Sequence, residues 1–565
     1  MKIYKIQIHA LILCLLITLL YLLSFVREIN GDGIGYIRRI EYNSWQTLFL
    51  PGHLIYCPFG LLLKNICSAI GIEAETHVIL RVFNSVLGGI GVALFSLVIF
   101  RYVRSNFLAI TTAFGLAISF GYWIQGIDVE TYMSALFFII LCLYLLESKF
   151  MTQYLIGFIL GVLHSLAVLF HLSNILFFPF MVISLFFRPL REGNPHADLV
   201  GIKRDENRIT PPPRLPLFSY LFTFIVVTGS VYYYVMFQLM NICSLAEAWE
   251  WIFSSTHEFK DTTGPINLIK AFYGFARGII YVDLIFTSNW GINIAKFVII
   301  TFMLFLFSLF LIKRGKDIVN HYRDILISLF IWIIPYLLFA IFFFSSDTER
   351  WVFILPPLWL IFALSITARK SDKQINLKQR CGIIIILIII FGTNLVTTVY
   401  PMHRQDSRIK RSTFLARYIK DGDLIITPGH DQTDFIWLYN GIKCDVLELT
   451  YVVGGLKGEK NSIFEYMDRE IYYKLTAGQR IFLIRIFDDP KNREMIYGWK
   501  EITPLGIRRE DFVSYFSRYN YTPIAFYEKE GLTLWELLGP IPHISIYISN
   551  PVVAINSIII PSFSL

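Results

Sequence analysis

Residues 9–26 read "HALILCLLITLLYLLSFV", an apolar run long enough to cross a bilayer as a helix. Residues 30–45 follow almost at once as "NGDGIGYIRRIEYNSW", which places the acidic side chain of Asp32 between two glycines. The apolar run lacks a clear small-residue cleavage site, and many similar runs follow it, so we predict an uncleaved first membrane helix. Asp32 is therefore expected in the first loop, at the membrane surface.

The composition is that of a membrane protein. The 565 residues are 55% hydrophobic and only 16% charged, whereas soluble domains have roughly 25% charged residues. The mean hydropathy is +0.57. The net charge of +8 comes from Lys and Arg clustered in short loops, so we expect the lipid bilayer as a partner and no nucleic acid. Seven scattered cysteines without CxxC spacing predict free thiols.

The hydropathy of the chain predicts about eleven spanning helices, because one crossing needs ~20 apolar residues. Together these helices predict an all-α polytopic membrane domain over residues 1–400. The predicted spans are 8–26, 78–100, 106–124, 132–146, 153–170, 172–187, 216–238, 292–312, 325–344, 351–367 and 381–399.

The distribution of basic residues predicts the orientation. With the N-terminus in the cytoplasm, the N-terminus and inner loops carry about 20 Lys and Arg, and the outer loops before residue 400 carry about 8. An odd number of spans then places the C-terminus outside. We predict a multi-pass protein of a bacterial or archaeal plasma membrane, with outer loops 27–77 and 239–291 lying in the membrane interface. Prolines in the first of these loops favour an interfacial or re-entrant helix pair.

From about residue 400 the pattern changes to short apolar runs between helical segments. The runs "DLIIT" (423–427), "QRIFLIRIF" (479–487) and "GLTLWELLG" (531–539) predict strands. We therefore predict a soluble, extracytoplasmic α/β domain over residues 401–565.

Under this topology several acidic side chains share the outer surface. Acids at bilayer level are costly unless they are paired or face water, which makes Asp32 and Glu130 candidate catalytic carboxylates. The glycines beside Asp32 are expected to let the backbone bend toward a ligand. No downstream residue is predicted to pair with Glu41. A divalent metal between Asp32 and Glu130 is left open, since no cluster has metal-ligand spacing.

Several motifs, taken in chain order, resemble the GT-C superfamily of membrane glycosyltransferases, in particular its protein O-mannosyltransferase-like branch. The Asp32 loop continues into "FLPGHLIY" (49–56), which is similar to a Pro-Gly segment of that branch. This segment departs from the family at Phe49, where the family has His, and at His53, where it has Tyr. The match extends over about residues 1–370, and its other motifs are "RVFN" (81–84), "YWIQGIDVETYM" (122–133), "LFHLSN" (169–174) and "DTERWVFILPP" (347–357).

The resemblance implies an enzyme that moves a hexose or pentose from a polyprenyl-phosphate donor to a hydroxyl acceptor, on protein, lipid or glycan, at the outer face. Configuration at the anomeric carbon would invert. Asp32 would be the general base, and Glu130 would position the acceptor or bind a metal. Arginines would hold the leaving phosphate through their fork geometry. The predicted substrate-binding residues are Arg81, Arg350, His53, Tyr56, His171 and Asp128.

Two other functions are considered. An O-antigen ligase or polymerase depends on a large outer loop with Arg and His and needs no first-loop acid. A lipid-linked sugar transporter or flippase would call for inverted repeats and charges deep in the spans, and the sequence shows neither pattern.

Overall fold

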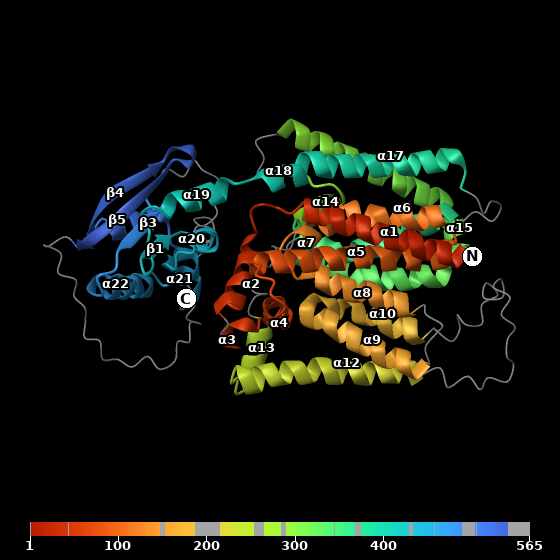
Figure 1. The fold of residues 1–565 in the computed structure, drawn as a ribbon, viewed down its shortest axis with the longest axis horizontal. Helices are drawn as coiled ribbons and strands as arrows, with labels where there is room; N and C mark the ends of the chain where they lie inside the picture. Colours follow the sequence, from red (N-terminus) through yellow and green to blue (C-terminus); the bar gives the residue numbers. More distant parts are fainter. Residues whose placement is uncertain are drawn as a thin grey trace. The chain divides into compact units, whose positions relative to one another are not determined.

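The structure is a computed structural model of the chain (Figure 1). It describes residues 2–42, 45–146, 153–186, 215–253, 265–283, 290–343, 345–367, 375–428, 433–456, 458–488, 503 and 506–540. The predicted basic inner loop at 188–214 lies outside the described residues. The chain divides into two compact units, Met1–Arg404 and Gln405–Leu565, which are described separately.

The first unit is helical throughout its described part. Most of its helices are apolar. Several also contain buried polar side chains, which form hydrogen bonds where one helix ends and the next begins. Its elements are α1 (Lys2–Leu23), α2 (Gly31–Tyr42), α3 (Trp45–Leu48), α4 (Tyr56–Ala69), α5 (Thr76–Val103), α6 (Asn106–Ile118), α7 (Phe120–Ile127), α8 (Tyr132–Leu146), α9 (Gln153–Phe170), η1 (Leu172–Phe177), α10 (Phe178–Phe186), α12 (Leu215–Tyr233), η3 (Tyr234–Leu239), α13 (Leu245–Phe253), α14 (Pro265–Ile279), α15 (Trp290–Phe342), η5 (Thr348–Ile354), α16 (Leu355–Thr367), α17 (Leu377–Asn394), η6 (Leu395–Val399) and α18 (Tyr400–Arg404).

Helix α5 is the centre of this unit and packs against α1, α6, α7 and α8 (Figure 1). Small residues permit the close approach of α1, as they do between many membrane helices. A Cβ on Gly88 would lie 2.8 Å from the Tyr21 ring. A Cβ on Gly89 would overlap the Thr18 side chain and lie 2.8 Å from the Cys14 carbonyl oxygen. The close contact between α1 and α5 therefore depends on glycine at positions 88 and 89, where a side chain would not fit.

Among the described residues, six helices are long and apolar enough to cross a bilayer, or seven if the bent pair α6–α7 is one span. The chain is thus a multi-pass membrane protein, but the predicted count of eleven is not confirmed. Three further apolar helices, within 132–146, 154–170 and 172–186, are shorter. Two of the predicted spans, 292–312 and 325–344, lie in the single element α15, which joins two helices across a non-helical residue, Tyr322.

The break between α6 and α7 occurs at Ser119, and the two helices meet at 66°. A break frees backbone carbonyls that must find other donors inside a membrane. The side chain of Asn394, which is fully buried, donates to the carbonyl oxygen of Ile118 (2.9 Å), and Trp359 donates to the Ser119 hydroxyl (3.0 Å). The bend is thereby stabilised, and α7 leads into the loop at 128–131.

The predicted interfacial segment 27–77 contains α2, α3 and α4 rather than one helix pair. Helix α2 buries Ile34, Ile37 and Ile40 at helical spacing. The expectation for Glu41 was wrong, because this carboxylate accepts hydrogen bonds from Lys64 of α4 (2.7 Å) and from Thr76 at the start of α5. These bonds join three helices near the ends of the segment.

The second unit is an α/β sandwich around a five-stranded sheet with the order β2-β1-β3-β5-β4. β1 is parallel to β2 and β3, and β5 is antiparallel to β3 and β4. Its described elements are α19 (Ser407–Leu415), β1 (Leu424–Thr427), α20 (Thr433–Asn440), β2 (Asp445–Glu448), α21 (Leu449–Gly455), α22 (Lys460–Thr476), β3 (Ile481–Ile484), α24 (Arg509–Phe516), β4 (Tyr519–Tyr527), η8 (Glu528–Glu530) and β5 (Leu532–Pro540).

Two hydrophobic clusters cover the two faces of this sheet. Ile425 and Phe482 face one cluster with α19 and α20, whereas Ile426 and Leu483 face the other with α21, α22 and α24. This alternation along the strands is what a sheet buried on both faces requires.

We expect Gly89→Ala to destabilise the first unit by about 1–3 kcal/mol, because its methyl group has no room against α1. Gly392→Ala in α17 is the matched control, since a Cβ there meets nothing within 4 Å, and it is expected to be neutral or mildly stabilising. Thermal unfolding of the two purified variants in detergent tests this. Equal melting temperatures would contradict the close α1–α5 contact.

Candidate functional site

The site begins at the N-terminus of α2. Asp32 is exposed and lies in the first turn of this helix, whereas the sequence analysis expected it in a loop. The side chain of Asn30 caps the helix by accepting the backbone N–H of Gly33 (2.6 Å). This cap fixes where the helix begins and therefore where Asp32 projects.

Gly33 brings α2 against the loop between α7 and α8. A Cβ at this position would lie 2.9 Å from the carbonyl oxygen of Val129 and 2.8 Å from Ile29. The glycine pattern around Asp32 thus serves close packing, rather than the backbone bend that the sequence suggested. At Gly35, two residues on, a Cβ would meet nothing within 4 Å.

Glu130 lies in this loop and is almost completely buried. Asn84 of α5 holds the loop by donating to the backbone oxygens of Asp128 (3.0 Å) and Glu130 (2.9 Å). Asn30 donates to Oε1 of Glu130, whereas Oε2 has no hydrogen-bond partner among the described residues. Burial, followed by the charges of Glu349 and Asp32, raises the pKa of Glu130 well above its ordinary value. This environment therefore favours the protonated form of Glu130 over the charged form.

A third segment, between α15 and α16, supplies a cation. Arg350 donates to the Tyr132 hydroxyl (2.7 Å) and lies 3.6 Å from the Asp347 carboxylate. Asp347 also caps η5 through the N–H of Glu349 (3.1 Å). The segment thus presents two acids and one arginine beside Glu130, whose pKa responds to the Glu349 charge.

Two histidines and Tyr132 form one wall of the site. The ring of His171 lies 4.7 Å from the ring of His53 and 4.3 Å from that of Tyr132, measured between centroids. Nδ1 of His171 accepts the N–H of Ser173 (3.3 Å), so its neutral ring carries the proton on Nε2, which lacks a hydrogen-bond partner among the described residues. Burial and the charges of His53 and Arg350 lower the pKa of His171.

The Pro-Gly loop that carries His53 is held on both sides. Tyr232 donates to the Pro51 carbonyl oxygen (2.9 Å), and the N–H of Leu172 donates to that of Gly52 (2.9 Å). Tyr56 follows this loop, is buried, and packs edge-on against Tyr36 of α2, with ring centroids 5.0 Å apart. The loop therefore joins the start of α4 to the turn at His171.

Arg81 and Asp128 form a buried pair of their own. A guanidinium nitrogen of Arg81 lies 3.5 Å from the Asp128 carboxylate, and its guanidinium carbon lies 5.7 Å from the Phe25 ring centroid. Asp128 also accepts the N–H of Val129 (2.8 Å). These contacts show Arg81 and Asp128 holding the loop that carries Glu130, while their predicted roles in substrate binding stay predictions.

Two cations were missed by the sequence analysis. Arg277 of α14 is half-buried, donates to the Ser346 carbonyl oxygen (3.0 Å), and has its guanidinium 4.9 Å from the Tyr281 ring centroid. Lys296 of α15 donates to the Tyr281 carbonyl oxygen (3.0 Å) and is almost fully buried. Both cations are therefore linked through Tyr281.

Asn30 was also missed, although its position before a glycine-rich helix start is typical of a cap.

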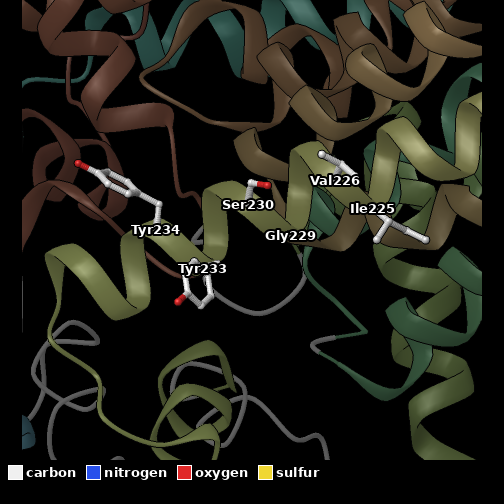
Figure 2. Close-up of a pocket in the computed structure, with 6 residues that line it drawn as sticks. All are labelled: Ile225, Val226, Gly229, Ser230, Tyr233 and Tyr234. Carbon is white, nitrogen blue, oxygen red and sulfur yellow. The ribbon is translucent and has the colours of Figure 1, made fainter.

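Among the described residues, no three His, Cys, Asp or Glu side chains come together as metal ligands, so the metal left open by the sequence stays untested. A separate surface hollow of about 560 Å³ is lined by α12 and the first residue of η3, and it holds none of the candidate residues (Figure 2). Its lining residues are Ile225, Val226, Gly229, Ser230, Tyr233 and Tyr234.

Comparison with known proteins identifies the fold. No protein-family model and no curated protein matches the sequence. The crystal structure of ArnT from Cupriavidus metallidurans bound to undecaprenyl phosphate matches with a TM-score of 0.53 at 11% identity, over 94% of this chain and 97% of ArnT. Its apo state matches with a TM-score of 0.55 at 11% identity, over 93% and 97%.

The chain shares its fold with ArnT. At this identity the likeness to ArnT concerns the fold, and the O-mannosyltransferase-like branch expected from the sequence is not confirmed.

The buried state of Glu130 predicts a pH dependence. Since its folded-state pKa is raised, its contribution to stability is full below the ordinary Glu pKa of about 4.3 and is lost as the pH rises toward the folded-state value. The Glu130→Gln variant keeps a side chain of nearly the same shape and removes the titratable carboxyl group. We expect the melting temperature of the wild type to fall relative to this variant between pH 5 and pH 8. A difference in melting temperature that stays constant with pH would contradict the raised pKa of Glu130.

Proposed function

We propose that the chain is an integral-membrane glycosyltransferase that moves a sugar from a polyprenyl-phosphate donor to a hydroxyl acceptor, with inversion at the anomeric carbon. The observation that carries this proposal is the exposed carboxylate of Asp32 near the buried Glu130, with Arg350 bonded to Tyr132 two residues after Glu130. Two carboxyl groups in unlike environments are suited to different roles in one reaction. ArnT, which has this fold, was crystallised bound to undecaprenyl phosphate, and this supports the donor class.

In the proposed reaction the acceptor oxygen attacks the anomeric carbon of the sugar. A new bond forms between them, while the bond from the anomeric carbon to the carrier phosphate oxygen breaks. The acceptor proton passes to Asp32, and the electron pair leaves with the phosphate. In this proposal the protonated form of Glu130, which its environment favours, and Nε2–H of His171 donate hydrogen bonds to sugar or acceptor oxygens.

The departing phosphate needs positive charge beside it, because negative charge grows on its oxygens in the transition state. Arg350 follows Glu349 in the chain and lies 3.6 Å from the Asp347 carboxylate, and Arg277 donates to Ser346 in the same segment. Arg81 is a less direct candidate, since its guanidinium already faces Asp128. We assign phosphate binding to Arg350 first and to Arg277 second.

The topology remains part of the proposal. We place the reaction on the outer side of a bacterial or archaeal plasma membrane, with the N-terminus in the cytoplasm and the second unit outside. The O-mannosyltransferase-like branch rests on the sequence motifs alone. His53 and Tyr56 line the Pro-Gly loop beside Asp32's helix, and we propose that they contact the substrate.

Asp32→Asn tests the assignment of the base. We expect transfer from a panel of polyprenyl-phosphate sugars to fall by about 10²–10⁴-fold, because an amide cannot accept the proton. Glu73→Gln is the matched control, since Glu73 is an exposed acid elsewhere in the outer segment. Release of polyprenyl phosphate and labelled product by the purified, folded protein is the measurement. Unchanged sugar transfer by the Asp32→Asn variant would show that Asp32 is not the general base.

Gly33→Ala tests whether the position of Asp32 matters. A methyl group here has to push α2 away from Val129, and a misplacement of about 1 Å can cost up to about 100-fold in rate. We expect kcat to fall by roughly 10–100-fold with little change in KM for the donor. Gly35→Ala, which has free space, is expected to keep wild-type kcat. Equal kcat for the two variants would argue against the close approach.

A further inference from the structure

Three buried polar side chains of the first unit form a hydrogen-bonded network that the proposed reaction does not use. They are His164 of α9, Asn174 of η1 and Tyr336 of α15, and each is fully buried. The polar atoms of all three side chains have hydrogen-bond partners. Polar groups among apolar membrane helices are costly to bury and commonly serve a function, so the position of this network deserves an explanation.

Asn174 is the centre of the network. Its side-chain nitrogen donates to the carbonyl oxygens of His171 (2.9 Å) and Ala167 (3.3 Å), and its backbone N–H donates to the first of these (3.0 Å). The Tyr336 hydroxyl donates to its side-chain oxygen (2.9 Å), and Nε2 of His164 donates to its backbone oxygen (2.9 Å). These bonds fix the turn in which α9 ends and η1 begins, and His171 is the residue between the two helices.

Two neighbouring helices hold this turn. A carbonyl oxygen only accepts, so Nε2 of His164 carries a proton, and in a neutral ring Nδ1 then accepts the Tyr220 hydroxyl of α12 (2.7 Å). The turn is thus bonded to α12 through His164, and to α15 directly through Tyr336. A buried network in which every member is hydrogen-bonded is rigid, so the backbone at His171 has a defined position.

The network also reaches the aromatic wall of the site. The Tyr336 ring lies 5.3 Å from the Phe353 ring of η5, measured between centroids. Phe353 in turn lies 5.8 Å from the rings of both His171 and Tyr132. Asn174 therefore holds the backbone of His171, the aromatic wall holds its ring, and Tyr336 contributes to both.

We propose that Asn174 and Tyr336 are positioning residues for sugar transfer, because they fix the turn that presents Nε2–H of His171. This inference rests on the proposed function, in which that N–H donates a hydrogen bond to a sugar or acceptor oxygen. Neither positioning residue contacts the substrate, and both act through His171. Their effect is therefore expected in kcat, with little change in KM for the donor.

The first experiment is Tyr336→Phe, which keeps the ring and removes the hydroxyl that holds Asn174. We expect kcat for sugar transfer to fall by roughly tenfold, because a small displacement of a reacting group costs a large factor in rate. Tyr322→Phe is the matched control on the same helix, since it also removes a bonded hydroxyl, whose partner Thr367 (2.9 Å) is not a candidate site residue. It should keep the wild-type kcat. Release of polyprenyl phosphate by the purified proteins is the measurement.

A double variant separates positioning from a general loss of packing. His171→Phe keeps an aromatic ring, removes both ring nitrogens, and is expected to lower kcat. Adding Tyr336→Phe to it should lower kcat no further, because no Nε2–H is left to position. Two losses that multiply, or an unchanged kcat in either single variant, overturn the proposal.

A spectroscopic measurement does not depend on transfer. In NMR spectra of the protein with isotope-labelled histidine, the ring-nitrogen signals of His171 are identified by their loss in His171→Phe. They should shift in Tyr336→Phe and stay in place in Tyr322→Phe, and equal positions in all three proteins overturn the proposal. If Tyr336→Phe does not fold, Tyr220→Phe removes the hydroxyl at the other end of the network and replaces it in every measurement, with the same expected directions.

These results distinguish the proposed function from the positioning role. A wild type that transfers no sugar from any polyprenyl-phosphate donor contradicts the proposed function, while a shift of the His171 signals in Tyr336→Phe still supports the network. Transfer by the wild type with an equal kcat in Tyr336→Phe keeps the proposed function and overturns the positioning role alone.

Discussion

The candidate site depends on one amide side chain, that of Asn30. Its oxygen caps α2 and its nitrogen donates to Glu130, so two segments separated by 100 residues are bonded through a single residue. The cap decides where Asp32 stands, and the second bond decides which oxygen of Glu130 remains available. Gly33 permits this arrangement because any side chain there meets the Val129 carbonyl. The geometry of the acids is therefore set by α2 and by the loop that α5 holds.

Much of the outline follows from the sequence. Apolar length reveals a polytopic membrane protein, and the one-sided distribution of charge brought Asp32, Glu130 and Arg350 into one hypothesis before their contacts were known. In the structure the charges of Asp32 and Glu349 raise the pKa of Glu130, and Arg350 donates a hydrogen bond to Tyr132. Strand-forming runs after residue 400 likewise lie in β1, β3 and β5. The apolar and strand-forming runs are local features of the sequence. The grouping of the charged residues follows from the cost of placing a charge inside a bilayer.

The remainder depends on contacts between distant residues, which periodicity and composition do not encode. Asn30 looks like a cap from sequence, but its bond to Glu130 depends on tertiary packing. The contact of Arg81 with Asp128, 47 positions away, could not be seen in the sequence, and the predicted role of Arg81 in phosphate binding stays a prediction. Glu41 looked isolated because Lys64 and Thr76 approach it only after three helices assemble. The break at Ser119 and the merged element α15 show why counting apolar runs did not settle the number of spans.

The bond between Tyr132 and Arg350 has a consequence for biogenesis. These residues are 218 positions apart, so at about 5–20 residues per second the ribosome needs roughly 10–40 s to make the second after the first. During that interval Tyr132 and the neighbouring Glu130 have been synthesised without the arginine that Tyr132 later accepts a hydrogen bond from. Asn30 and Asn84, which hold the Glu130 loop in the finished protein, are both made before that loop. The part of the site that carries the acids can therefore assemble before the arginine is made.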